Sequence, residues 1–192
     1  MGLEFNWLFN VLDMNRLIAR CSLLFITILP LFACQKDNVS KLNGVWKITR
    51  QTDDISITGS GGTISESNNY SLSDSDLYLS FEIEESDNTA VQTGTATLSY
   101  GSKTSKTSFT YSPSSKTIAF KKRISASSVE VKNEEKDKTL KRTIELTSEF
   151  EIRELTNKKM VLGQWYVRKE SSGGQVLTQI QEEIIFSLSK VN

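Results

Sequence analysis

Apolar and polar residues alternate along most of the chain after residue 40. The alternation has a period of two residues and is clearest in residues 77–83, 117–121, 140–153, 160–166 and 176–188. Because successive side chains of a β-strand point to opposite faces, this pattern indicates strands with one buried and one exposed face. Residues 179–188 contain few helix breakers, but their alternation favours a strand there too.

Short clusters of Ser, Gly, Asn, Asp and Pro separate these runs. Such clusters are typical of turns, so we expect eight to ten antiparallel strands joined by hairpins. This all-β pattern predicts an up-and-down β-barrel or a sandwich. Residues 56–76 differ, because they are rich in Ser, Gly, Asn and Asp and lack a clear apolar face. We expect most of that stretch to be a mobile loop near an open end.

The N-terminus carries an apolar run at residues 23–34, Leu-Leu-Phe-Ile-Thr-Ile-Leu-Pro-Leu-Phe-Ala-Cys. The run is too short for a spanning helix, which needs about 20 residues. Arg16 and Arg20 precede it, as in the positive region of a secretory signal peptide. A buried core helix is the alternative, but Pro30 and the polar residues that follow the run argue against it.

We therefore expect residues 1–33 to be a signal peptide that is removed. Translation is expected to start at Met14, because a signal of ordinary length then precedes Cys34. Residues 1–13 add acidic and aromatic side chains that a signal peptide does not need.

Leu31-Phe32-Ala33-Cys34 resembles the bacterial lipobox. The resemblance implies cleavage before Cys34 and acylation of that residue, and two or three acyl chains make a stable anchor. Gln35-Lys36-Asp37-Asn38 is similar to the signal that sends Bacteroidetes-type lipoproteins to the outer-membrane surface, although Asn38 departs from its acidic preference. The alternative is an ordinary polar tether. We expect a lipidated tether at 34–40 and a folded domain at 41–192.

Two further motifs resemble the bacterial lipocalin-like lipoproteins. Leu42-Asn43-Gly44-Val45-Trp46 opens the domain, and Phe150-Glu151-Ile152-Arg153-Glu154-Leu155-Thr156 lies near its end, before a strand at Met160-Val161-Leu162. The resemblance implies a small β-barrel with its mouth at one end and no catalytic residue. It also implies structural core positions, which are Gly44, Trp46, Phe150, Ile152 and Leu155. Trp46 would close the barrel, with packing as its main role and ligand contact as the alternative.

Charge and composition exclude several functions. Lys and Arg number 23, Asp and Glu also number 23, and there is no histidine. A net charge of zero argues against nucleic acid as a partner, and the missing histidine removes the usual catalytic triads. Asp74-Ser75-Asp76 is a weak metal motif without a full set of ligands. We therefore predict no enzyme activity, no metal and no cofactor.

Two charged residues interrupt the apolar positions of their strands, namely Arg142 and Glu182. A lone charge there costs free energy unless it is paired or lies near a rim. One interpretation is a bulge or a position at the mouth. The other is an inward Arg142 that stacks on an aromatic ring or pairs with a carboxylate.

The sequence leaves two functions open for an outer-membrane, lipid-anchored barrel. The first is binding of a small apolar or amphipathic ligand inside the barrel. The second is a structural or interaction role, with a barrel filled by side chains and an envelope protein as the partner. Interior volume separates them, because eight strands can either fill themselves or hold one ligand. Six aromatic residues are either sugar-stacking rings at the mouth or ordinary strand aromatics, namely Tyr70, Tyr78, Tyr100, Tyr111, Trp165 and Tyr166.

Overall fold

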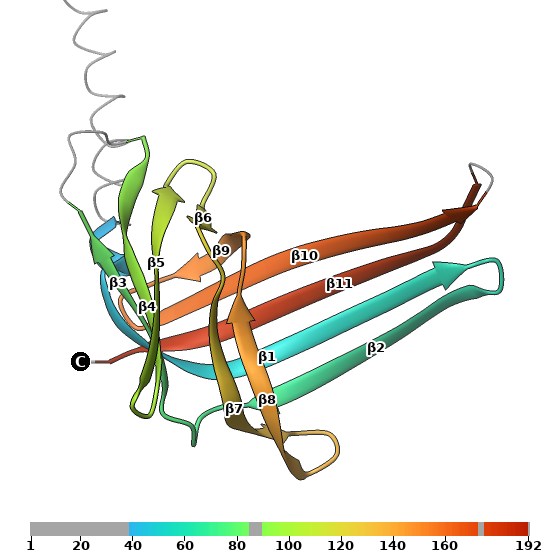
Figure 1. Cartoon of the computed structure of the whole chain (residues 1–192), viewed down its shortest axis with the longest axis horizontal. Helices are drawn as coiled ribbons and strands as arrows, with labels where there is room; N and C mark the ends of the chain where they lie inside the picture. Colours follow the sequence, from blue (N-terminus) through green and yellow to red (C-terminus); the bar gives the residue numbers. More distant parts are fainter. Residues whose placement is uncertain (1–38, 85–89, 173–174, 192) are drawn as a thin grey trace, which may run out of the picture. The chain divides into compact units, whose positions relative to one another are not determined.

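Nearly all of the described chain is β-strand. The computed structural model describes residues 39–84, 90–172 and 175–191, all within the compact unit Asn38–Asn192. A helical turn at residues 39–42 precedes eleven strands (Figure 1). No helix in this part of the chain has the length and apolar character needed to cross a membrane. The expected signal peptide at residues 1–33, Cys34 and the export motif at 35–38 lie outside the described residues.

Eight antiparallel strands close into a barrel. Their order is β1–β3–β4–β5–β6–β9–β10–β11, and β11 pairs with β1 to complete the ring. The strands are β1 (Gly44–Gly59), β3 (Leu77–Ile83), β4 (Gln92–Tyr100), β5 (Lys103–Ser112), β6 (Thr117–Phe120), β9 (Glu149–Leu155), β10 (Lys159–Ser172) and β11 (Gln175–Lys190). The predicted all-β antiparallel barrel is therefore confirmed, and closure of the ring decides against an open sandwich.

The barrel encloses a dense aromatic core. Five phenylalanine rings from five strands form a chain across it, with centroids 5.2 to 6.5 Å apart. The rings belong to Phe81, Phe109, Phe120, Phe150 and Phe186. Such spacings are those of favourable edge-to-face and offset ring pairs.

Three barrel strands, β1, β10 and β11, continue past the barrel and form with β2 a sheet that we call the arm (Figure 1). The arm contains Arg50–Gly59 of β1, β2 (Gly62–Ser71), Gln164–Ser172 of β10 and Gln175–Ser187 of β11. The strand order across it is β10–β11–β1–β2. Its outermost strands are β2 and β10, so the arm has two edges.

The arm corrects the expectation of a mobile loop at residues 56–76. Residues 56–59 and 62–71 are strand, and β1 pairs with β2 in unbroken register from Arg50↔Ser71 to Gly59↔Gly62. Polar side chains lie on both faces of β2, Ser65 and Ser67 on one and Glu66 and Asn68 on the other, so the segment has no apolar alternation. The backbone ladder does not need such alternation, which is why hydrophobic periodicity failed to find these strands.

The remaining strands, β7 (Ile124–Asn133) and β8 (Lys138–Leu146), form a hairpin outside the ring. Its apolar side chains join the same buried cluster as the barrel interior. They are Ile124, Ala126, Val129, Val131, Ile144 and Leu146. The hairpin also pairs with the start of the arm, through Tyr70↔Asn133 and Ser71↔Lys132. It therefore connects the barrel core to the base of the arm.

Candidate functional site

The inner face of the arm continues the inner face of the barrel. Directly opposed residues on neighbouring strands lie on one face, so the registers define rows across the arm. One row near the tip reads Ile64, Ile57, Ile180 and Arg168 from β2 to β10. The next row reads Glu66, Ile55, Glu182 and Tyr166. Ile64 is 75% exposed and Ile57 41% exposed. Apolar side chains on this face are therefore exposed to solvent where the arm leaves the core.

A buried polar junction fixes the base of this face. Arg142 of β8 donates from Nη1 to Asp53 Oδ2 of β1 at 2.9 Å, and its guanidinium lies 4.0 Å from the ring centre of Tyr70 on β2. Gln51 Nε2 donates to the other oxygen of Asp53, Oδ1, at 2.6 Å. Gln51 and Asp53 are both buried. The junction ties β1, β2 and β8 together.

The junction answers the question that the sequence left open for Arg142. The second interpretation is correct, since Arg142 both pairs with a carboxylate and stacks on an aromatic ring. A β-bulge is also present, but in the opposing strand, between Ala126 and Val129 of β7. Glu182 lies half-buried on β11, directly between Ile55 and Tyr166.

A second set of contacts holds the hairpin to β10. Gln164 Nε2 donates to the Thr147 carbonyl oxygen at 2.6 Å, and the Tyr166 hydroxyl donates to Gln164 Oε1. The hydroxyls of Thr147 and Tyr166 are 2.8 Å apart. At the base of the arm, Arg142 of the hairpin therefore contacts β1 and β2 on the inner face, and Thr147, which follows the hairpin, contacts β10.

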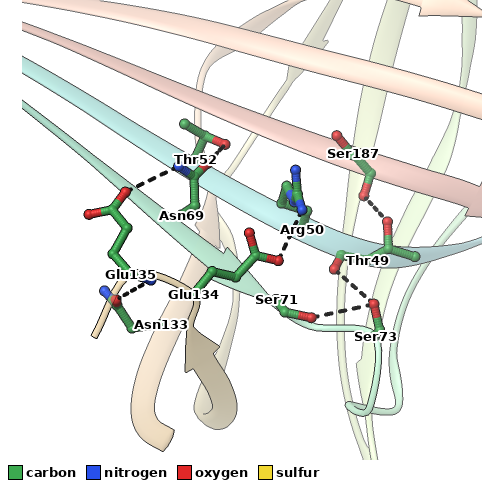
Figure 2. Close-up of polar contacts among 10 residues, drawn as sticks. All are labelled: Thr49, Arg50, Thr52, Asn69, Ser71, Ser73, Asn133, Glu134, Glu135 and Ser187. Atoms are coloured by element: carbon green, nitrogen blue, oxygen red, sulfur yellow. Dashed lines mark hydrogen bonds and ion pairs between the residues drawn. The ribbon is translucent and has the colours of Figure 1, made fainter. Parts of the chain in front are cut away.

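Polar contacts clamp the tip of the hairpin to the outer face (Figure 2). Arg50 pairs with Glu134 at 2.9 Å, and Asn69 Nδ2 donates to Glu135 Oε1 at 3.3 Å. Thr52 donates to Asn69 Oδ1 at 2.8 Å, while Asn133 Oδ1 accepts the backbone N–H groups of the turn. With the inner junction, these contacts grip β1 and β2 from both faces.

The two edges of the arm differ in chemistry. On β10, Trp165 is 58%, Tyr166 37% and Val167 56% exposed, and Arg168 and Lys169 follow. The β2 edge is mainly Ser, Thr, Asn and Glu, with Ile64 as its exposed apolar residue. The consecutive residues Trp165-Tyr166-Val167 interrupt the alternation of this strand and are the sequence signal for its edge, although Met160–Leu162 and Ile184–Phe186 interrupt it in the same way.

The outer face of β10 is closely covered at its base. The Arg153 guanidinium of β9 pairs with Glu183 of β11 and lies against Gly163. A Cβ atom at residue 163 would lie 2.5 Å from Arg153 Nε, so a larger residue there would displace the guanidinium from the strand. Glu183 is buried by the contact. Beyond Gly163 the strand has no such cover.

A shallow hollow lies on the barrel side of the molecule. An open groove of about 370 Å³ runs over the outer surface of β4, β5 and β6, above Thr93, Thr110 and Ala119, with Glu84 and Lys121 among its lining residues. Phe109 and Phe120 of the aromatic core are among its lining residues, beside small ones such as Gly94 and Ser108. The groove is open to solvent and is not an enclosed chamber.

The residues expected to form the structural core lie on the barrel. Trp46, Phe150 and Ile152 are buried, and Leu155 is partly buried against the same cluster. Trp46 Nε1 donates to the Leu42 carbonyl oxygen at 2.9 Å, and Lys190 Nζ lies 5.1 Å from its ring centre.

Gly44 meets a conformational demand at the start of β1. Its φ of 118° lies where side chains are strained, and a Cβ atom there would lie 3.2 Å from Lys190 Cε. The Gly-x-Trp motif thus combines a backbone requirement with a packed ring. Cys34, the expected lipidation site, lies outside the described residues.

Three titratable groups in the described part of the chain have shifted pKa values. Burial raises the pKa of Tyr111, which lies in the barrel core. At the exposed hairpin tip, a hydrogen bond between Lys132 and Asp137 raises the pKa of the lysine and lowers that of the aspartate. Within residues 39–84, 90–172 and 175–191, no three His, Cys, Asp or Glu side chains gather as a metal site, and the Asp74–Asp76 motif brings no third ligand.

Comparisons with protein-family models, with curated proteins and with solved structures find no match to this chain.

Proposed function

We propose that this chain is a lipid-anchored outer-membrane protein that works by protein contact, with a filled barrel as the rigid body and the arm as the interacting part. It is not an enzyme in this proposal. The main observation behind the proposal is that the arm extends beyond the barrel core (Figure 1). Its apolar and aromatic side chains there are exposed to solvent. Exposed apolar groups of this kind mark interaction surfaces.

The packing of the barrel supports a filled interior over a ligand chamber. Inward residues from every barrel strand are buried, and the five phenylalanine rings meet across the space between the strands. A lipocalin-type carrier of eight strands must leave room for its ligand. Here aromatic side chains occupy that room.

Ligand carriage is the second candidate, and the groove above Thr93 and Ala119 favours it. Its volume of about 370 Å³ falls within the range of small-molecule sites. Native mass spectrometry of the detergent-extracted protein separates the two functions. The filled barrel predicts the mass of the acylated chain alone, whereas a carrier would lose a stoichiometric small molecule on denaturation.

The anchor has its own test. A Cys34→Ser variant should leave the membrane fraction or keep its signal peptide, since acyl chains supply the attachment. Cys21→Ser is the matched control, because that cysteine lies within the expected signal peptide and should not alter fractionation. Membrane-bound, processed Cys34→Ser protein would overturn the lipoprotein part of the proposal.

The arm is tested by photo-crosslinking in intact cells. A photo-reactive phenylalanine analogue replaces Trp165 on the arm or Lys106 on the exposed side of β5. We expect protein crosslinks at position 165 and none at position 106. Equal crosslinking at both positions, or none at position 165, would overturn the arm as the interacting part.

A further inference from the structure

We propose that two copies of this chain pair edge to edge through β10, in antiparallel register about a two-fold axis at Val167. The pairing would join the two arms into one continuous sheet. This inference deepens the proposed function, on which it rests, by naming the partner of the arm as a second copy.

The first support is an unpaired strand edge. On the side of β10 away from β11, β9 pairs only with Met160–Gly163. No other strand pairs with β10 there among the residues that the structure describes. From Gln164 to Glu170, β10 keeps regular register with β11, and the register shifts only at Ser171. An edge of this length presents backbone N–H and C=O groups that can template a further strand.

The second support is that the middle of this edge is apolar, with the charged residues Arg168 and Lys169 only after it. Natural edges are blunted by charge, Pro, bulges or shortness. The middle of this one holds Trp165, Tyr166 and Val167, each more than a third exposed. The β2 edge of the same arm presents Ser65, Ser67 and Asn68 instead. An apolar edge on one side only indicates a specific partner there.

The third support is the chemistry of self-pairing. A two-fold axis at Val167 places Val167 opposite its own copy, Tyr166 opposite Arg168, and Trp165 opposite Lys169. Each aromatic ring then meets a cation of the other copy, on both faces of the sheet. Directly opposed side chains of this kind attract through the ring quadrupole.

The fold selects the same register independently. Pairing cannot extend past Gly163 of either copy, because β9 already occupies that edge. The regular open stretch is Gln164–Glu170, and its midpoint is Val167. An axis at Val167 therefore both fits the open stretch between the two β9 strands and places each aromatic ring opposite a cation.

An acidic extended peptide from another protein is the competing occupant. It could add to β10 as a strand and meet Arg168 and Lys169 with carboxylates. It would leave Trp165 and Tyr166 without their matched cations, so the observations favour the second copy.

A symmetric disulfide tests the axis directly. Opposed residues of an antiparallel pair have Cα atoms about 4.5 or 5.5 Å apart, and both distances fit a disulfide. Full-length Val167→Cys, expressed and oxidised in its own membrane, should give a crosslinked species of twice the chain mass on non-reducing gels. Ile64→Cys is the matched control, since it is an exposed apolar residue on the opposite edge. It should run at the mass of a single chain on the same gels.

A second measurement uses no new cysteine. In the detergent-solubilised protein, sedimentation velocity should show a dimer, and Val167→Lys should weaken it by about tenfold because two like charges then face each other. Ile64→Lys should leave the dimer unchanged.

Three outcomes would overturn the pairing. They are a monomeric wild type, equal crosslinking of Val167→Cys and Ile64→Cys, and a crosslink at position 167 to a different protein. The last outcome would leave the proposed function standing, because the arm would still contact protein. A failure of that function would appear instead as arm positions without any protein crosslink.

Discussion

The barrel and the arm share three strands, β1, β10 and β11, yet the two parts bury their side chains to different extents. In the barrel half, β1 places Trp46 and Ile48 in a core shared with every other barrel strand. In the arm half, the same strand ends in Ile57, which is 41% exposed. Burial of apolar area is the main stabilising contribution to a fold. The comparison teaches that the barrel is complete by itself, whereas the arm has surface left for a partner.

The largest expected effect is the difference in unfolding free energy between alanine variants of two tryptophans. Trp46→Ala should lower the free energy of unfolding by about 3–5 kcal/mol, because it empties a fully buried aromatic site. Trp165→Ala on the arm should change it by less than about 0.5 kcal/mol, as surface substitutions usually do. Chemical denaturation of both variants measures the difference. Equal losses would contradict the division between barrel and arm.

The polar junction should matter more than a surface ion pair. Arg142→Met leaves the buried Asp53 carboxylate without its cation and should cost about 1–3 kcal/mol in unfolding free energy. Arg123→Met is the control, since its pair with Glu145 is solvent-exposed and should contribute below about 1 kcal/mol. A double-mutant cycle with Asp53→Asn isolates the pair. A coupling energy near zero would show that the junction does not fasten the hairpin to the arm.

Two glycines sharpen the comparison further. A Cβ atom at residue 94 in the barrel would lie 2.2 Å from the Glu82 carbonyl oxygen, so Gly94→Ala should destabilise by about 1–3 kcal/mol. At the arm tip, a Cβ atom at residue 61 would meet nothing within 4 Å. Gly61→Ala should therefore be neutral or slightly stabilising. The midpoint of thermal unfolding should be lower for Gly94→Ala than for Gly61→Ala. Equal midpoints would mean that the barrel backbone near residue 94 can shift to accept a Cβ atom.

The smallest effect concerns pH. Burial raises the pKa of Tyr111 above its ordinary value of 10.0. The folded chain therefore keeps the phenol proton at pH values where the unfolded chain has released it. The resulting stabilisation is full below pH 10 and is lost as pH rises through the folded pKa. Unfolding free energy measured from pH 8 to 11 should fall less steeply in Tyr111→Phe than in the wild type. Parallel curves would place the phenol in contact with solvent.

The sequence predicted the barrel because its strands have one apolar and one polar face. Leu77, Leu79 and Phe81 alternate with polar residues, and all three are buried. The β1–β2 part of the arm was missed because backbone hydrogen bonds, with little help from apolar side chains, define β2. Periodicity reports burial on one face, and β2 buries neither face fully.

The candidate site was predictable only in part. The misfit of Arg142 among apolar positions marked the junction, but its partners Asp53 and Tyr70 lie 89 and 72 residues away in the sequence. Such contacts follow from the tertiary fold and have no local signal. The Trp165–Val167 triplet marked the open edge of β10, while the absence of a neighbouring strand depends on where β9 ends.

Hydrogen–deuterium exchange tests the central claim most directly, namely that the barrel is self-sufficient and the arm is completed by a partner at β10. Wild-type protein and Val167→Lys are compared in detergent, at a concentration where the wild type is dimeric. We predict that exchange in the peptide covering Trp165–Lys169 becomes at least about tenfold faster in the variant, because its edge amides lose their partner strand. Peptides from β4 and β5 should exchange equally in both proteins. Equal protection of Trp165–Lys169 in the two proteins would contradict the account.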